Sequence, residues 1–238
     1  MSIYGFLHER GIDEVYQAVV LAMFLLALGG LAVRRRLAAA GGGIVPDEGV
    51  SVRNVIEVIV EMLVGQARSI MGDEYRSYFP VVASIFLFIL VSNLMGLVPG
   101  VGGATTDVNT ALAWAIISFV VYNLVGIRTH GWRYVYQFMG PALMEREIGG
   151  RHYHIRVLAP FFLPLELMLH FARILTLTVR LLANMFSDHK VVAVWSTIVP
   201  IAVPAVFMGL GFIVAVLQAF VFSLLTMIYI GMALEEPH

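Results

Sequence analysis

One arginine, Arg180, stands in an almost entirely apolar stretch of the chain, with leucine, valine and phenylalanine on both sides. A guanidinium group stays protonated at any biological pH and carries five hydrogen-bond donors. Placing this charge at the centre of a bilayer costs from about 2.5 kcal/mol on insertion scales to over about 10 kcal/mol in simulations. We therefore expect Arg180 to act on the path of an ion or of a charged substrate.

Other polar side chains share the helix face that is expected around Arg180. At about 100° per residue, the polar residues from 166 to 188 fall within roughly 100° of one another. This polar stripe consists of Glu166, His170, Arg173, Arg180, Asn184, Ser187 and Asp188. In lipid, such a face must contact protein or water. An internal ladder of ion pairs from Glu166 through His170 to Arg173 would explain the first half of the stripe without any function.

Arg180 has no acidic residue three or four positions away, where a partner on the same helix would stand. The interiors of the other apolar segments hold no acid, although Asp107 lies at the outer end of one and Gln218 offers an amide in the last. A carboxylate from a partner subunit is the simplest counter-ion. If that carboxylate takes up and releases protons, Arg180 becomes an electrostatic gate on proton transfer.

The composition places these residues in a helical membrane protein. Apolar residues make up 60% of the chain and charged residues 13%, compared with about 25% in soluble domains. Long uninterrupted apolar runs favour helices over a barrel, so we expect one all-α transmembrane domain over residues 1–238. The predicted spans are residues 15–33, 79–98, 111–127, 158–198 and 205–234. The last two form a long hairpin that turns at Pro200 and Pro204, since proline breaks helix interiors.

Residues 51–70 are predicted to form an interfacial amphipathic helix rather than a span. Their apolar residues recur at three- and four-residue steps, with Glu57, Glu61 and Arg68 mostly on the opposite face.

The distribution of basic residues predicts the orientation of the spans. Arginines concentrate between the first two spans and after the third, whereas residues 99–110 and 199–204 hold no arginine or lysine. Basic segments stay in the cytoplasm, so the N-terminus lies outside and the C-terminus inside. The acidic N-terminal residues are unlike those of a cleavable signal, and the short chain favours a bacterial plasma membrane.

Several classes of site are not expected. The net charge of −1 gives no reason for a nucleic-acid partner, and the lack of cysteine excludes disulfides, thiolate metal sites and a cysteine nucleophile. His152 and His154 lie in a basic loop without an acid or a third histidine at useful spacing. We therefore expect no catalytic site, metal or cofactor.

Four stretches of the sequence resemble subunit a of the F-type ATP synthase. They are the run Pro164–Met185, the stretch Asn93–Pro99, the stretch Thr106–Asn109, and Leu217–Phe220 followed by a Thr-Xaa-Xaa-Tyr pattern. The resemblance extends over about residues 75–235, in the order and spacing of that family. The predicted topology is also similar, with an outside N-terminus, an interfacial second helix and a long final hairpin.

The resemblance implies a non-catalytic, proton-conducting stator against which a ring of c subunits rotates, with peripheral-stalk b subunits as further partners. Each c subunit would supply the carboxylate that Arg180 lacks. Protons would reach it through one aqueous half-channel and leave through another, with Arg180 between them. The family's glutamine and asparagine fall on Gln218 and Asn184. Glu166, His170 and Arg173 would also lie on the path, and Asp107 would line its outer mouth or merely cap a helix.

The chain departs from the family at one pair of positions. Many members carry a carboxylate and a histidine, one after the arginine and one before the glutamine. His189 stands at the first position, with Asp188 beside it, and Gly211 stands at the second. Position in the family favours His189, whereas the helical geometry favours Asp188, which lies on the polar stripe. Both residues could instead belong to a surface irregularity of the helix.

A self-contained secondary transporter or proton antiporter, with Arg180 as its anion site, is the alternative function. Such a transporter should show repeated halves with paired helix breaks. Pro200 and Pro204 have no counterpart in the first three spans. The choice between proton and sodium rests mostly with the c-ring, so this chain does not decide it.

Overall fold

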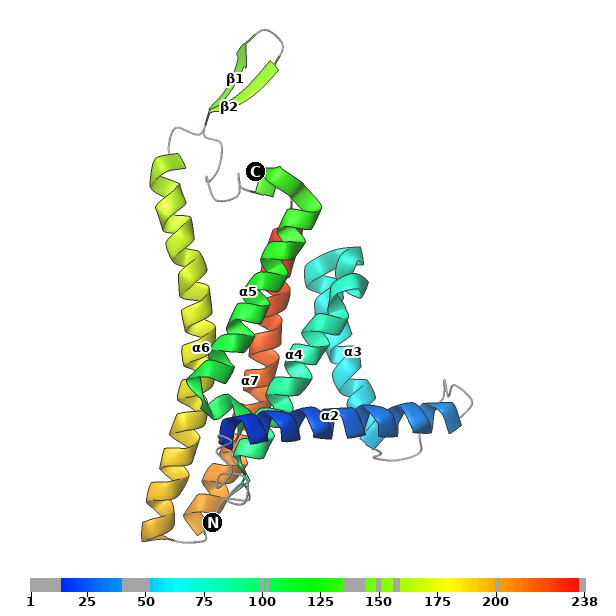
Figure 1. The fold of residues 1–238 in the computed structure, drawn as a ribbon, viewed down its shortest axis with the longest axis vertical. Coiled ribbons are helices and arrows are strands. Elements are labelled where there is room, and N and C mark those ends of the chain that lie inside the picture. The colour runs from blue at the N-terminus through cyan, green and yellow to red at the C-terminus, as the bar shows by residue number, and fades with distance from the viewer. Residues whose placement is uncertain are drawn as a thin grey trace.

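The computed structural model describes residues 14–39, 52–98, 101, 103–134, 144–148, 151–155, 159–199 and 202–235. The helices are α2 (Glu14–Ala39), α3 (Val52–Met71), α4 (Tyr75–Gly96), α5 (Val108–His130), α6 (Ala159–Ile198) and α7 (Ala202–Leu234). Two short 3-10 turns, η1 (Gly72–Glu74) and η2 (Ala104–Thr106), precede α4 and α5. Figure 1 shows α4 to α7 gathered into an elongated bundle.

Each predicted helix is present, and its ends lie within four residues of those expected, except that α2 extends to Ala39, six residues beyond the predicted end. The largest shift that bears on the site is at α7, which begins at Ala202 rather than at residue 205. Pro204 therefore lies in the first turn of α7. That position tolerates proline because the amide hydrogens of a first turn have no partner within the helix. The hairpin of α6 and α7 is formed as expected (Figure 1).

A small antiparallel pair of strands was not predicted. Strands β1 (Met144–Ile148) and β2 (Arg151–Ile155) pair with Met144 opposite Ile155 and Ile148 opposite Arg151. This hairpin is a small exception to the expected all-helical fold, in a segment that was expected to be part of a basic loop. Each strand has only five residues, most of them polar and without a clear alternation, so its signal is much weaker than that of the long apolar runs. The hairpin projects beyond the helices (Figure 1).

Helix α7 lies at the centre of the bundle, against α3, α4, α5 and α6. Phe222, Met227 and Ile230 of α7 are fully buried. Gly231 allows α3 to approach closely, since a Cβ added there would lie 3.1 Å from the carbonyl oxygen of Ile70. A helix that is apolar on all sides is suited to this central position.

Helix α2 runs crosswise to the bundle (Figure 1). It buries Ala18 and Ala22, and it contacts α4 and η2. Most of its larger apolar side chains are exposed, including Val20, Phe24 and Leu31. Exposed apolar side chains along a whole helix are what lipid contact requires.

Four stretches of the described residues are long and apolar enough to cross a membrane. They are Val15–Arg35, Asn54–Gly96, Val108–Tyr134 and Ala202–Leu234. Helix α6 is not among them. A multi-pass helical membrane protein is thus supported, whereas the predicted five spans plus an interfacial helix stay a prediction.

Candidate functional site

The polar stripe lies along the border between the packed and the open face of α6. Leu177, Leu181 and Met185 are buried and hold α6 against the bundle. On the open face, exposed side chains follow one another at helical spacing; they are Thr176, Arg180, Ala183 and Ser187. His170 is buried, and Asn184 and Asp188 are half-buried. The stripe therefore offers some polar groups to neighbouring helices and others to whatever covers the open face.

The first half of the stripe forms the predicted ladder. Arg173 Nη2 lies 3.9 Å from Glu166 Oε1. His170 Nδ1 lies 2.9 Å from the carbonyl oxygen of Glu166 and 3.5 Å from its Oε1. Because Glu166 contacts both basic residues, these three side chains form one cluster, which we call the N-terminal cluster.

Aromatic side chains from two other helices complete this cluster. The Arg173 guanidinium lies over the ring of Tyr229 in α7, with Cζ 5.0 Å from the ring centroid. The ring of Tyr122 in α5 is tilted against both neighbouring rings, with its centroid 5.6 Å from that of Tyr229 and 5.9 Å from that of His170. Tyr122 was not predicted from the sequence, because a lone tyrosine in an apolar helix has the same pattern as any core aromatic.

The second half of the stripe is joined to α7 by one hydrogen bond between amides. Asn184 Nδ2 donates to Gln218 Oε1 at 2.8 Å, so two predicted site residues meet. Gln218 is 5% exposed, and its Nε2 has no hydrogen-bond partner within the described part of the chain. Buried polar groups are nearly always paired. The amide nitrogen of Gln218 is thus one of few buried polar atoms that lack a partner among the described residues.

Asp188 lies beside Gly211. A Cβ added to Gly211 would be 3.6 Å from Asp188 Oδ2, and 2.7 Å from Leu97 Cδ2. The absence of a side chain on Gly211 leaves room for this approach. His189 lies within α6, but its side chain is outside the described residues.

Arg180 is exposed on the open face of α6. Within the described ranges, no aspartate or glutamate forms an ion pair with it, and Glu166 of the stripe pairs with Arg173 and His170 instead. The predicted lack of an internal counter-ion therefore holds for the part of the chain that the structure describes.

Asp107 acts as a helix cap. Its Oδ1 accepts a hydrogen bond from the backbone nitrogen of Asn109 at 2.7 Å, at the N-terminus of α5. No hydrogen bond or ion pair among the described residues joins Asp107 to the stripe. Of the two roles expected for it, the structure shows the cap.

Sequence comparison identifies similar proteins. A family profile described as ATP synthase A chain matches residues 15–231. ATP synthase subunit a 2 of Syntrophotalea carbinolica is 41% identical over 202 residues, which cover 85% of this chain and 80% of that protein. ATP synthase subunit a of Geotalea uraniireducens is 36% identical over 230 residues, covering 97% and 91%. That of Bdellovibrio bacteriovorus is 35% identical over 210 residues, covering 88% and 86%.

Proposed function

The chain belongs to the ATP synthase subunit a family, and from this we infer that it is an ion-translocating membrane subunit that catalyses no reaction itself. We propose that it conducts protons as the stator beside a ring of c subunits in a bacterial plasma membrane, with peripheral-stalk b subunits as further partners. Family membership favours this function over the secondary transporter that the sequence left open.

The exposure of Arg180 without an ion-pair partner among the described residues is the observation that carries the proposal. A cation on the open face of α6 can approach a carboxylate on a c subunit. An arginine near a carboxylate favours its ionised form, so the approach of Arg180 would release the proton that the carboxylate carries. A fixed cation also repels protons, which opposes a direct leak past it.

Arg180 separates two groups of polar side chains along α6. The N-terminal cluster ends at Arg173, about 10 Å before Arg180 along the helix axis, and Asp188 lies about 12 Å beyond it. We assign the cluster of Glu166, His170 and Arg173 to the half-channel that opens to the cytoplasm. Asn184, Gln218 and Asp188 belong to the half-channel that opens outside. Asp107 would lie near the mouth of the latter.

Asp188 is our choice for the titratable residue of the outer half-channel. Relatives with a side chain at the position of Gly211 would fill the space that Asp188 Oδ2 approaches here. The carboxylate of Asp188 thus reaches from α6 to the position on α7 where many members of the family carry a titratable side chain. His189 remains the alternative by position in the family.

Helix lengths determine how these groups sit in the bilayer. Helix α6 has 40 residues and is about 60 Å long, twice the roughly 30 Å of the hydrocarbon core. A helix of this length that stays within the membrane must tilt steeply. We propose that α2, which runs crosswise to α6, lies nearer the membrane normal and begins outside, and that α3 lies at the cytoplasmic interface (Figure 1). The C-terminus of α7 then faces the cytoplasm.

ATP-driven acidification of inverted membrane vesicles tests the proposal. Arg180→Ala should abolish coupled pumping. Arg128→Ala is the matched control, because Arg128 is exposed in the last turn of α5 and far from the stripe in sequence. Intact pumping by the Arg180→Ala complex would show that the stator assignment of this residue is wrong.

A further inference from the structure

A groove of about 630 Å³ lies between α2 and the first half of α5. Phe88 of α4 also lines it, and no residue of the polar stripe does. The groove therefore shares only Asp107, proposed above to lie near the mouth of the outer half-channel, with the proposed ion path. Helix α2 packs against α4 and η2, and the groove is the gap that remains between α2 and α5.

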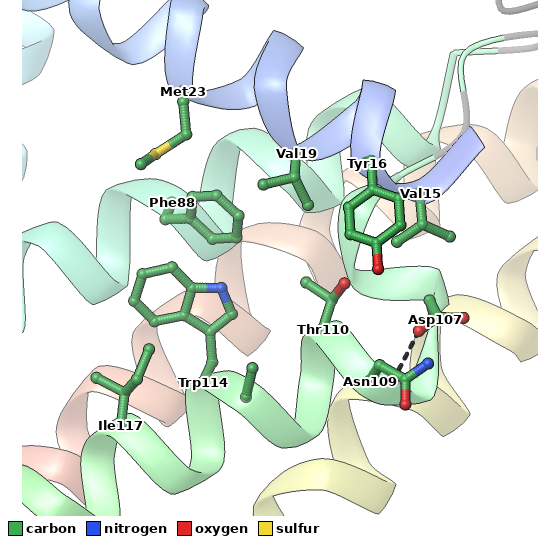
Figure 2. A pocket seen from close by; sticks show the side chains of 11 residues that line it. Val15, Tyr16, Val19, Met23, Phe88, Asp107, Asn109, Thr110, Trp114 and Ile117 are labelled. Atoms are coloured by element: carbon green, nitrogen blue, oxygen red, sulfur yellow. Dashed lines mark hydrogen bonds between the residues drawn. The ribbon is translucent and has the colours of Figure 1, made fainter. Parts of the chain in front are cut away.

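The two ends of the groove differ in polarity. Figure 2 shows Tyr16, Asp107, Asn109 and Thr110 gathered toward one end. Met23, Phe88, Trp114 and Ile117 line the other end. Pockets lined mainly by apolar side chains with a few convergent polar groups are typical of ligand sites, and their volumes span about 300–1,000 Å³. The polarity gradient suits an elongated amphipathic molecule.

We propose that this groove binds a phospholipid whose head group carries a primary amine. Its acyl chain would lie along Phe88, Trp114 and Ile117, and its ammonium group would approach Asp107. The carboxylate of Asp107 accepts one hydrogen bond from Asn109, and a carboxylate has about four acceptor positions, so it can accept another donor. Phosphatidylethanolamine has that donor, whereas an anionic head group such as phosphatidylglycerol would be repelled.

The aromatic residues support a position at the membrane surface. Tyrosine and tryptophan are enriched where the bilayer meets water, and Tyr16 and Trp114 stand on the two sides of this groove. A lipid chain between them would fill the gap between α2 and α5 and fix α2 to the bundle.

Tryptophan fluorescence tests this proposal in the full chain reconstituted in phosphatidylcholine vesicles. With Trp132→Phe and Trp195→Phe combined, Trp114 is the one tryptophan whose fluorescence is measured. Lipids with brominated acyl chains quench the fluorescence of a tryptophan that they contact. An exposed ion pair is worth a factor of about 1.5 to 5 in affinity. Brominated phosphatidylethanolamine should therefore quench Trp114 at a mole fraction lower by that factor than brominated phosphatidylglycerol.

Three variants separate the head-group contact from the groove itself. Asp107→Asn keeps a good helix cap but removes the charge, so the preference for the amine should disappear. Ala113→Phe fills the groove and should weaken quenching by brominated phosphatidylethanolamine, whereas Ile116→Phe, exposed on the same helix outside the groove, should not. Equal quenching by both head groups, a preference that survives Asp107→Asn, or an unquenched Trp114 would overturn the proposal. An unquenched Trp114 would mean that water or protein fills the groove.

Discussion

Replacement of Gln218 by methionine should disable ion translocation while leaving the fold as stable as before. Gln218 is buried, accepts one hydrogen bond from Asn184 and has an unpaired Nε2 among the described residues. Methionine has a similar volume and no donor. Gln218→Met therefore removes both the bond and the unpaired group.

The two effects on stability oppose each other. Loss of the Asn184–Gln218 hydrogen bond costs about 0.5–1.5 kcal/mol, and removal of a buried unpaired donor returns about 1–3 kcal/mol. The net change in the free energy of unfolding ranges from about 0.5 kcal/mol of destabilisation to about 2.5 kcal/mol of stabilisation. Pumping should fall, since the amide next to Asn184 is gone.

Asn93 provides the matched control, because it is a fully buried amide with both groups bonded. It accepts from Thr105 Oγ1 at 2.8 Å and donates to the carbonyl oxygen of Ala215 at 3.4 Å. Asn93→Leu leaves both partners unpaired and should destabilise the chain by about 2 kcal/mol or more. Thermal unfolding of the purified chain in detergent measures stability, and ATP-driven acidification of vesicles measures translocation.

Either of two results would contradict the proposed role of Gln218. If Gln218→Met lowers stability as much as Asn93→Leu does, Gln218 is a structural amide. If Gln218→Met unfolds normally and pumps at the wild-type rate, the buried amide takes no part in translocation.

Three further predictions follow from local contacts. Gly211→Val should crowd Asp188 and Leu97 and reduce ATP-driven pumping several-fold. Gly209→Val, whose added side chain meets open space, should pump normally. Equal pumping by the two variants would show that Asp188 takes no part in the ion path. Gly126→Ala should displace the ring of Tyr134 and break the hydrogen bond from its hydroxyl to Asn123 Oδ1 (3.0 Å). The free energy of unfolding should then fall by about 1–3 kcal/mol. An unchanged melting temperature would show that Tyr134 does not pack against Gly126. Glu166→Gln removes the negative charge that pairs with Arg173 and His170, and because these pairs are partly exposed it should cost at most about 1 kcal/mol in a melting experiment. Pumping should nevertheless fall, and wild-type pumping by Glu166→Gln would remove this residue from the path.

The sequence predicted the helices and the face of α6 that bears the polar stripe, because 3.6-residue periodicity and apolar length depend only on local order. It also predicted both partners of the Asn184–Gln218 bond through a family resemblance. It could not predict which face of α7 meets α6, since α7 is apolar almost all round and its pattern selects no face. The approach of Asp188 to Gly211 depends on that rotation, so it emerged only in the structure.

Contacts between distant helices were also beyond the sequence. Tyr122 joins the N-terminal cluster only because α5 packs against α6 and α7. The crosswise course of α2 could not be predicted either, since the sequence of a uniformly apolar helix does not indicate the angle at which it crosses its neighbours. The strands β1 and β2 were missed because they are short and strongly charged.

Cross-linking between α6 and a c subunit tests the central claim most directly. The chain has no cysteine, so one can be placed at Ala183, which is exposed one turn from Arg180, or at Leu181, which is fully buried. A second cysteine stands next to the essential carboxylate of the c subunit. The account predicts a disulfide between the subunits with Ala183→Cys and none with Leu181→Cys in the intact complex. Failure of Ala183→Cys to cross-link under conditions that oxidise an accessible cysteine pair would contradict the claim that Arg180 faces the c-ring.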